Sequence, residues 1–389
     1  MSNDARPEIR FPGFTDDWKQ RKLGDETKIL AGGDVDKTKL KENGKYPVLA
    51  NALTNDGIVG YYDDDFRIKA PAVTVTGRGD VGYAQARRVN FTPVVRLLSV
   101  KSKHDVDFLE NSINNHKVLV ESTGVPQLTA PQLGNYKIFF PTIEEETKIG
   151  SLFKKLDTAI NIHQRELDLL KETKKGFLQK MFPKNGAKVP EIRFPGFTED
   201  WEERKLGELG KTQSGIGFPD AEQGGSEGIP FFKVSDMNNI GNEYEMRNAN
   251  HYVSNEQIER KKWKPIKDVP AIIFAKVGAA IMLNRKRLVT SPFLIDNNTM
   301  AYLFNNTWDI YFGKILFETI NLPRYSQVGA LPSYNSSDIE NISVKVPVKD
   351  EQQKIGTFFK QLDDTIALHQ RKLDLLKETK KGFLQKMFV

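Results

Sequence analysis

The sequence predicts an α+β protein built as a tandem duplication. Two mixed α/β domains are expected, separated by two long helices that form an antiparallel coiled coil with pseudo-twofold symmetry. Three observations predict this fold class. A short opening segment occurs twice, a long segment with a coiled-coil heptad occurs twice, and the regions between them share a frame of turns and β-branched runs. An internal repeat is a strong signal because it fixes the architecture before any single element is assigned.

The opening segment of each copy is nearly the same. Pro7–Gly24 and Pro190–Gly207 are identical at 15 of 18 positions, at an offset of 183 residues. We therefore assign residues 1–144 to a first domain that contains the opening motif 7–24. Residues 190–350 form a second domain that contains the motif 190–207, and residues 183–189 form a linker between the copies.

A long helix is expected after each domain, a central one at residues 145–182 and a C-terminal one at residues 351–389. Glu145–Phe182 and Glu351–Phe388 match at 28 of 38 positions at an offset of 206. Their apolar positions recur in alternating steps of four and three residues, the pattern of a coiled-coil seam. In the first helix these positions are Ile149, Phe153, Leu156, Ile160, His163, Leu167, Leu170, Lys174, Phe177 and Met181. About 36 helical residues give a rod of roughly 54 Å.

A histidine occupies the same place in each seam, at His163 and His369. A metal site or a pH switch is one interpretation, and polar seam positions that fix the helix register are the other, which we favour. The lysines of the last turns are expected on a solvated face rather than against nucleic acid. In the first helix these lysines are Lys171, Lys174, Lys175 and Lys180.

The regions between motif and helix diverge, but a strand–turn–strand unit is expected in each, beginning at Pro71 and at Pro270. Each unit has a β-branched run, a turn with glycine (Gly79, Gly278), a second apolar run and a basic cluster. The offset between copies grows from 183 to 199 to 206, so the second copy carries insertions of 16 and 7 residues, as loops tolerate.

Composition restricts the class of protein. The 389 residues carry a formal charge of +6, and the two helical stretches account for +5 of it, so bulk charge in the domains is near neutral. Absence of cysteine excludes disulfides and thiolate metal sites. No signal core and no membrane-length apolar run is found, so a cytoplasmic location is expected.

Motifs for catalysis are missing from the sequence. There is no Gly-x4-Gly-Lys-Ser/Thr loop for ATP, and the two Gly-x-Gly strings lack the third glycine of a dinucleotide or S-adenosylmethionine site. The Asn-Pro-Pro-aromatic motif of adenine methyltransferases does not occur, and the five histidines lack metal-ligand spacing. We therefore expect a chain that is not an enzyme and holds no cofactor.

An ordered set of motifs that occurs twice carries a resemblance to a known family. These motifs are Trp18 with Arg21–Gly24, Trp201 with Arg204–Gly207, and the string from Pro347 to Gly356 that leads into the second helix. The chain resembles, over essentially its whole length, the specificity subunit of type I restriction–modification systems. The first copy departs slightly, with Glu-Glu-Thr where the second has Glu-Gln-Gln.

The resemblance implies a non-catalytic function in recognition of double-stranded DNA. In that family, two target recognition domains each read half of a split DNA sequence, and the helices set the spacing. The resemblance also implies two methyltransferase subunits as partners, which carry S-adenosylmethionine, and restriction or translocase subunits, which use ATP and Mg²⁺.

Candidate DNA-binding residues are placed on the strand–turn–strand units and on the loop before each helix. Arg and Lys contact phosphates, Arg pairs with guanine, and Gln or Asn pairs with adenine. In the first domain the candidates are Arg78, Arg87, Arg88, Thr123 and Gln127. In the second they are Lys276, Arg285, Lys286, Arg287, Arg324 and Gln327.

Two other functions stay open. A coiled-coil scaffold whose two domains bind proteins or peptides would account for the seams but not for basic clusters at matching places. A self-contained enzyme is disfavoured by the missing motifs.

Overall fold

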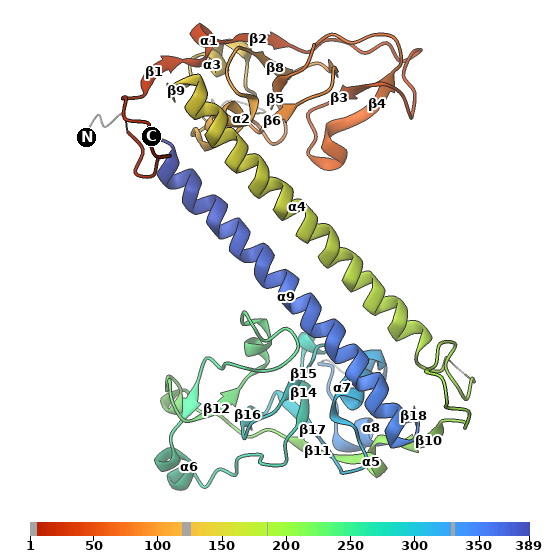
Figure 1. Cartoon of the computed structure of the whole chain (residues 1–389). Coiled ribbons are helices and arrows are strands. Elements are labelled where there is room, and N and C mark those ends of the chain that lie inside the picture. The colour runs from red at the N-terminus through yellow and green to blue at the C-terminus, as the bar shows by residue number, and fades with distance from the viewer. Residues whose placement is uncertain (1–5, 119–125, 185, 328–330) are drawn as a thin grey trace. The chain divides into compact units, whose positions relative to one another are not determined.

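A computed structural model of the chain describes residues 6–118, 126–184, 186–327 and 331–389. The chain divides into two compact units, of which the first joins Met1–Glu166 to His369–Val389 and the second is Leu167–Leu368. Each unit therefore contains one globular domain and a part of each long helix (Figure 1). Within the described part of the chain, no helix is both long and apolar enough to cross a membrane.

The domain of the first unit is a set of short strands with three short helices. The strands are β1 (Lys19–Lys22), β2 (Lys28–Ala31), β3 (Tyr46–Leu49), β4 (Ile58–Tyr62), β5 (Ala72–Thr76), β6 (Ala84–Arg87), β7 (Thr92–Pro93), β8 (Leu97–Lys101) and β9 (Lys137–Phe140). The helices are α1 (Leu23–Glu26), α2 (Val106–Asn115), α3 (Ala130–Gly134) and the 3₁₀ turn η1 (Thr54–Gly57). The sheets run β2-β8-β5-β6, β4-β3-β7 and β1-β9.

The domain of the second unit repeats this plan. Its strands are β10 (Glu202–Lys205), β11 (Gly210–Ser214), β12 (Ile229–Phe232), β13 (Tyr252–Val253), β14 (Ala271–Ala275), β15 (Lys286–Val289), β16 (Leu294–Ile295), β17 (Thr299–Phe304) and β18 (Ser343–Val346). Its helices are α5 (Leu206–Leu209), α6 (Asn255–Lys261), α7 (Ile310–Thr319) and α8 (Ser336–Glu340), with 3₁₀ helices η2 (Asp220–Glu222), η3 (Val234–Asn238), η4 (Ala279–Leu283) and η5 (Leu322–Tyr325).

The sheets of the second unit run β11-β17-β14-β15, β13-β12-β16 and β10-β18, the same orders as in the first. In both units the middle strand of the three-stranded sheet pairs in parallel with one neighbour and antiparallel with the other. The duplicated α+β architecture predicted from the sequence is therefore confirmed. The longer second copy places α6 and η3 between its equivalents of β3 and β5.

The interior strands β5 and β14 lie in the cores of the two domains. Both are buried at all five residues because each is apolar or β-branched throughout and is paired on both sides. Such uninterrupted runs are typical of strands covered on both faces. In the first unit Trp18 packs edge-on against Phe108 of α2 at 5.9 Å, and in the second Trp201 packs against Phe312 of α7 at 5.8 Å.

The opening motif of each copy ties a domain to both long helices, α4 (Ile143–Lys180) and α9 (Lys349–Met387). Arg10 donates two hydrogen bonds, at 2.7 and 2.8 Å, to the fully buried carboxylate of Glu145 near the start of α4. The backbone N–H of Ile9 donates to the carbonyl of Lys386 near the end of α9, at 2.9 Å. Bidentate pairing of this kind gives both energy and a fixed orientation.

The second copy makes the same contacts with the helices exchanged. Arg193 donates two bonds of 2.8 Å to the buried carboxylate of Glu351 at the start of α9. The N–H of Ile192 donates to the carbonyl of Lys180 at the end of α4, at 2.9 Å. The repeated sequence PEIRFPGF is thus a clamp that joins the beginning of one long helix to the end of the other.

The two long helices are antiparallel within each unit, as the sequence predicts. In the first unit Lys380 of α9 pairs with Asp157 of α4 at 2.6 Å, and Phe388 contacts Phe153 at 5.6 Å. In both contacts a residue near or just after the C-terminal end of α9 meets one from the N-terminal half of α4. Both helices begin two residues before the predicted starts and end two residues before the predicted ends.

In the second unit the end of α4 packs against the beginning of α9. Phe177 of α4 contacts Phe358 of α9 at 4.9 Å.

Lys174, which the sequence places on a solvated face, is only 7% exposed in the structure, so that prediction is wrong. Its ammonium lies 2.8 Å from Asp363 and 2.6 Å from Glu318, because the seam position turns it toward α9 and α7.

Candidate nucleic-acid interface

In the first unit, the loop after β5 is held by two other segments. The side chain of Asn51 accepts a hydrogen bond from the N–H of Gly77 at 2.8 Å and donates one to the carbonyl of Val95 at 3.1 Å. The N–H of Leu128 donates to the carbonyl of Gly77 at 3.0 Å. A Cβ at position 77 would lie 2.3 Å from the carbonyl oxygen of Arg96, so this close approach requires glycine.

We call this surface the first tip and define it as Asn51, Gly77–Gly79, Val95–Arg96 and Gln127–Leu128. Two predicted DNA-binding residues lie on it, because Arg78 and Gln127 are both exposed there. Asn51, Arg78 and Arg96 line one shallow hollow. Arg96 has a φ of +73°, a conformation rare for a residue with a side chain and one that persists only where the surroundings enforce it.

The second unit builds the same arrangement from different residues. The N–H of Tyr334 donates to the carbonyl of Lys276 at 3.0 Å, the counterpart of the bond from Leu128 to Gly77. The N–H of Gly278 donates to Pro332 at 2.9 Å, and the N–H of Gln327 donates to Ser333 at 3.0 Å.

The second tip is accordingly defined as Ser214, Lys276–Gly278, Gln327 and Pro332–Tyr334. It brings together two predicted site residues, Lys276 and Gln327. The ammonium of Lys276 donates to the hydroxyl of Ser214 at 3.0 Å, and the exposed amide of Gln327 donates to Asp338 at 3.1 Å. Both side chains are therefore oriented by hydrogen bonds to neighbouring side chains of the same domain.

Arg87 and Arg88 lie at the far end of the first hairpin, away from the first tip. Arg87 is opposite Ala72, the first residue of β5, and it donates to the Thr74 hydroxyl at 3.0 Å. Burial lowers the pKa of its guanidinium. Arg88 is exposed and forms an ion pair with Asp107, and a hydrogen bond to that carboxylate raises the pKa of Arg88.

The basic cluster of the second hairpin is turned inward. Lys286 donates to the carbonyl of Ile320 at 2.6 Å, and burial lowers its pKa to about 8. Arg287 bonds backbone carbonyls, and burial lowers its pKa as well. Arg285, just before β15, donates to the side chain of Asn238.

The two basic clusters do not occupy equivalent places, which corrects an argument from the sequence. In the first hairpin Val75 is opposite Ala84, and in the second Phe274 is opposite Lys286. The second loop is three residues longer and contains η4, so an alignment at a constant offset of 199 fails beyond the turn. Lys286 corresponds in space to Ala84 and not to Arg87.

The remaining predicted residues lie elsewhere or outside the described part of the chain. Arg324 is exposed on η5, which packs against η4 of the second hairpin. Thr123 lies outside the described residues. Sequence reasoning missed Asn51, Arg96 and Ser214, which come from separate segments of the chain. A polar residue directly before the buried strand β8 was the available signal for Arg96.

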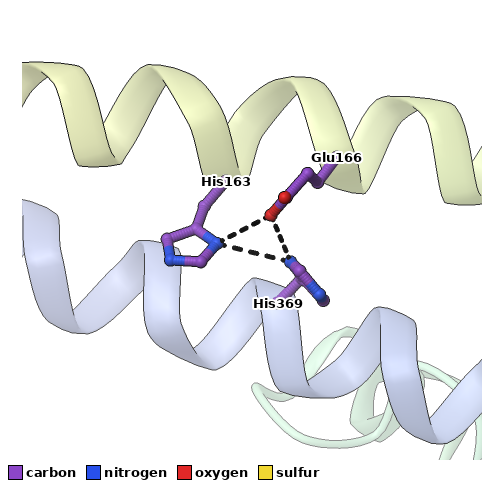
Figure 2. Close-up of side chains that lie close together, drawn as sticks. All are labelled: His163, Glu166 and His369. Atoms are coloured by element: carbon purple, nitrogen blue, oxygen red, sulfur yellow. Dashed lines mark hydrogen bonds and ion pairs between the residues drawn. The ribbon is translucent and has the colours of Figure 1, made fainter.

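Among the described residues, one group of three could hold a metal ion, namely His163, Glu166 and His369 on the long helices (Figure 2). It is separate from both tips, which contain no such group within the part of the chain that the structure describes.

Comparison with known proteins gives the family. A family model described as "Type I restriction modification DNA specificity domain" matches residues 15–172 and 198–378, which is most of the chain and both copies. The chain belongs to this family. The predicted resemblance to type I specificity subunits is thereby confirmed, and the two matches follow the duplication described above.

Type I specificity subunits that are similar to this chain differ in the length of the aligned region. The specificity subunit of the MjaVIII restriction enzyme of Methanocaldococcus jannaschii is 22% identical over 417 residues, covering 97% of this chain and 92% of that protein. S.MpnORF507P of Mycoplasma pneumoniae, named as a type I specificity subunit, is 30% identical over 142 residues. That match spans 35% of this chain and 39% of the relative.

Solved structures share the fold of this specificity-subunit family. The S subunit of a type I restriction–modification system from M. genitalium superposes with a TM-score of 0.74, at 16% identity, over 99% of both chains. A chain from a study of complex assembly and conformational transition of the type I system has a TM-score of 0.52 at 16% identity, over 97% of this chain and 98% of that one.

Proposed function

We propose that this specificity subunit reads a bipartite target in double-stranded DNA, one half with each tip. The observation that carries the proposal is the repeated loop pair, in which Leu128 bonds Gly77 in one unit and Tyr334 bonds Lys276 in the other. Each pair presents basic and amide side chains on a rigid scaffold. Base-edge contacts by such side chains give sequence specificity, while phosphate contacts give register.

The two half-sites differ in sequence under this proposal. The first tip offers Arg78 and Gln127, which suit guanine and adenine edges in the major groove, while Asn51 holds the loop through its bonds to Gly77 and Val95. The second offers Lys276 and Gln327. We assign Arg88, Arg285 and Arg324, which lie outside the two tips as defined, to phosphate contacts, and we retain Thr123, which precedes Gln127 in the sequence.

Three half-buried basic residues take a supporting function in this proposal. Arg87, Lys286 and Arg287 already donate to groups within their own domain. Moving them to DNA would break these bonds and leave the acceptors unpaired, at a cost of about 1–3 kcal/mol for each buried group. They hold the hairpins in shape for the residues at the tips.

Docking of methyltransferase subunits is proposed for the outer face of the long helices. Ile162 and Leu169 of α4 are 49% and 68% exposed, and their copies Leu368 and Leu375 of α9 are 44% and 68% exposed. Ile162 and Leu375 belong to the first unit, and Leu169 and Leu368 to the second, so each unit exposes one of these residues from each long helix. Their repetition at matching positions of both copies supports a partner surface on the long helices.

Catalysis is assigned to partner subunits, as the family resemblance implies. Methyltransferase subunits supply S-adenosylmethionine, and restriction subunits supply ATP and Mg²⁺ chemistry. The chain itself is a non-catalytic subunit that acts in the cytoplasm, where it selects the DNA sequence.

Replacement of one tip residue tests the proposal. In a complex with its methyltransferase subunits, Arg78→Ala is expected to weaken binding of the methylated target by about 1–3 kcal/mol and to relax one base position. Lys137→Ala is the matched control, because Lys137 is exposed on β9 of the same unit and is not one of the residues that form the tip. Binding is measured by DNA mobility shift at several salt concentrations, since phosphate contacts make affinity salt-dependent.

Two outcomes would contradict the proposal. An equal effect of Arg78→Ala and Lys137→Ala would mean that the first tip has no special contact with bases. Absence of any salt-dependent DNA shift by the complex would favour the alternative function, a coiled-coil scaffold with two protein-binding domains.

A further inference from the structure

Two histidines and one glutamate converge where α4 and α9 pack together in the first unit. His163 and Glu166 project from α4 and His369 from α9, and all three side chains point to one spot (Figure 2). The Nδ1 atoms of the two histidines are 3.4 Å apart. The Oε2 atom of Glu166 lies 3.1 Å from Nδ1 of His163 and 3.2 Å from Nδ1 of His369.

The size of this triangle fits a tetrahedral metal ion. Zinc binds histidine nitrogen at about 2.0–2.1 Å and carboxylate oxygen at about 2.0–2.2 Å. In a tetrahedron of that size any two ligand atoms are about 3.3–3.5 Å apart. The three measured edges lie within a few tenths of an ångström of this value, so a cation needs almost no movement of the side chains.

Hydrogen bonding alone satisfies the three groups less completely. Glu166 can accept an N–H from each imidazole, but the two donating nitrogens would then face one another at 3.4 Å with partial charges of the same sign. A divalent cation instead receives a lone pair from all three atoms. Imidazole nitrogen with carboxylate oxygen is a ligand set that suits zinc and neighbouring transition metals.

We propose that His163, Glu166 and His369 form a binding site for a divalent transition metal, with zinc as the best-fitting ion. The histidine side chains are 24% and 19% exposed and that of Glu166 is 47% exposed, so an ion can enter from solvent. The fourth position is left to water. The ion fastens α4 to α9 in the first unit, where the apolar seam is interrupted by two polar residues.

The repeat makes the site asymmetric. His163 and His369 correspond to one another at the offset of 206, but the counterpart of Glu166 is Lys372, an exposed residue of α9. Lys372 is three residues after His369, as Glu166 is three residues after His163. The histidine of α4 is therefore followed three residues later by a carboxylate ligand, whereas the histidine of α9 is followed at the same spacing by an exposed lysine.

Metal binding by the purified full chain tests the site, after removal of metals with a chelator. Calorimetric titration with Zn²⁺ is expected to show one ion per chain, and Co²⁺ should give visible absorption from a nitrogen–oxygen site. His369→Gln should weaken Zn²⁺ binding at least about tenfold, because even the loss of a hydrogen-bond partner of a metal ligand typically costs about 10–100-fold in affinity. Zn²⁺ should raise the Tm of the wild-type chain and not that of the variant.

Two control variants make the result specific. His116→Gln changes a histidine of the same unit that lies on α2's C-terminal side and stacks on Tyr136, so it should leave Zn²⁺ binding unchanged. Glu166→Lys should abolish the site, and the double exchange Glu166→Lys with Lys372→Glu should restore it from the opposite side of the histidine pair.

Three results would overturn the proposal. No Zn²⁺ or Co²⁺ binding by the wild-type chain would mean that the cluster is a hydrogen-bond network only. Binding that survives His369→Gln would place the metal elsewhere. A Glu166→Lys variant that binds Zn²⁺ as tightly as the wild type would exclude Glu166 as a ligand.

Discussion

Glu110 and Lys314 are the fifth residues of α2 and α7, and they carry opposite charges at the same position of the two units. Lys314 forms a buried ion pair with Asp363 of α9. Glu110 has the counterpart of that carboxylate, Asp157, as its neighbour. Burial raises the pKa of Glu110 to about 7, and the charge of Asp157 adds to the shift, whereas Lys380 opposes it.

The pKa of Glu110 makes the stability of the first unit depend on pH. An acid whose pKa is raised from 4.5 to about 7 by folding keeps its proton in the folded state while the unfolded chain loses it. The contribution of the Glu110 carboxyl group to the stability of the folded chain is therefore fully present below pH 4.5, and it is lost as the pH rises through about 7. Glu110→Gln should remove this loss and stabilise the chain at pH 8 by about 1–3 kcal/mol.

Urea unfolding of wild type and variant from pH 4 to pH 8 measures the effect. The two curves should coincide near pH 4 and separate as pH rises, because only the wild type has a group to ionise. Glu172→Gln on the exposed face of α4 is the matched control and should have no pH-dependent effect. A constant difference at all pH values would show that Glu110 acts through packing and not through its charge.

At the scale of elements, the heptad periodicity predicted the long helices more accurately than the constant-offset alignment of the two copies predicted the hairpins. The heptad placed both long helices to within two residues at each end, because a sustained apolar stripe specifies a helix. It did not specify what covers the stripe. Ile149 and Phe153 pack into the core of the first domain rather than against α9 alone. A sequence pattern states which face is apolar, and the tertiary fold decides what it meets.

The hairpins show why only part of the candidate site could be predicted. Arg78 and Lys276 could be placed on the loops that form the tips because they follow recognisable β-branched runs. Arg87 and Lys286 were matched to each other at a constant offset, but three extra residues in the second loop shift the register of β15. Asn51 was missed because its hydrogen bond to Gly77 joins residues far apart in the chain.

Gly176 lowers the stability of helix α4. It lies inside the helix, and a Cβ there would meet nothing within 4 Å. Glycine in a helix interior costs about 1 kcal/mol relative to alanine, because it loses more backbone freedom on folding. Gly176→Ala should therefore stabilise the chain by about that amount in thermal unfolding.

Gly382 in α9 provides an internal replicate for this prediction. Its surroundings are likewise open, and it belongs to the second copy of the identical 16-residue string. Gly382→Ala should give a similar gain. Loss of stability in either variant would contradict the assignment of open space around these glycines.

At the scale of the whole molecule, the proposed function divides two tasks between the conserved and the divergent parts of the duplication. The clamps formed by the opening motifs and the repeated helices are nearly identical in the two copies, whereas the tips differ. Structure common to both copies can position the domains, and residues that differ can select different bases. Each half of a target should then be changeable without altering the other.

An exchange of one domain tests this independence. Replacing residues 25–144 with the corresponding segment of another specificity subunit keeps Arg10 and Glu145, and thus the clamp. Sequencing of methylated sites in cells that make the chimera with its methyltransferase partners should show a new first half-site and the original second half-site. Exchange of residues 208–350 should give the converse result, because Arg193 and Glu351 are also kept. A change in both half-sites after a single exchange would mean that the tips do not read DNA separately.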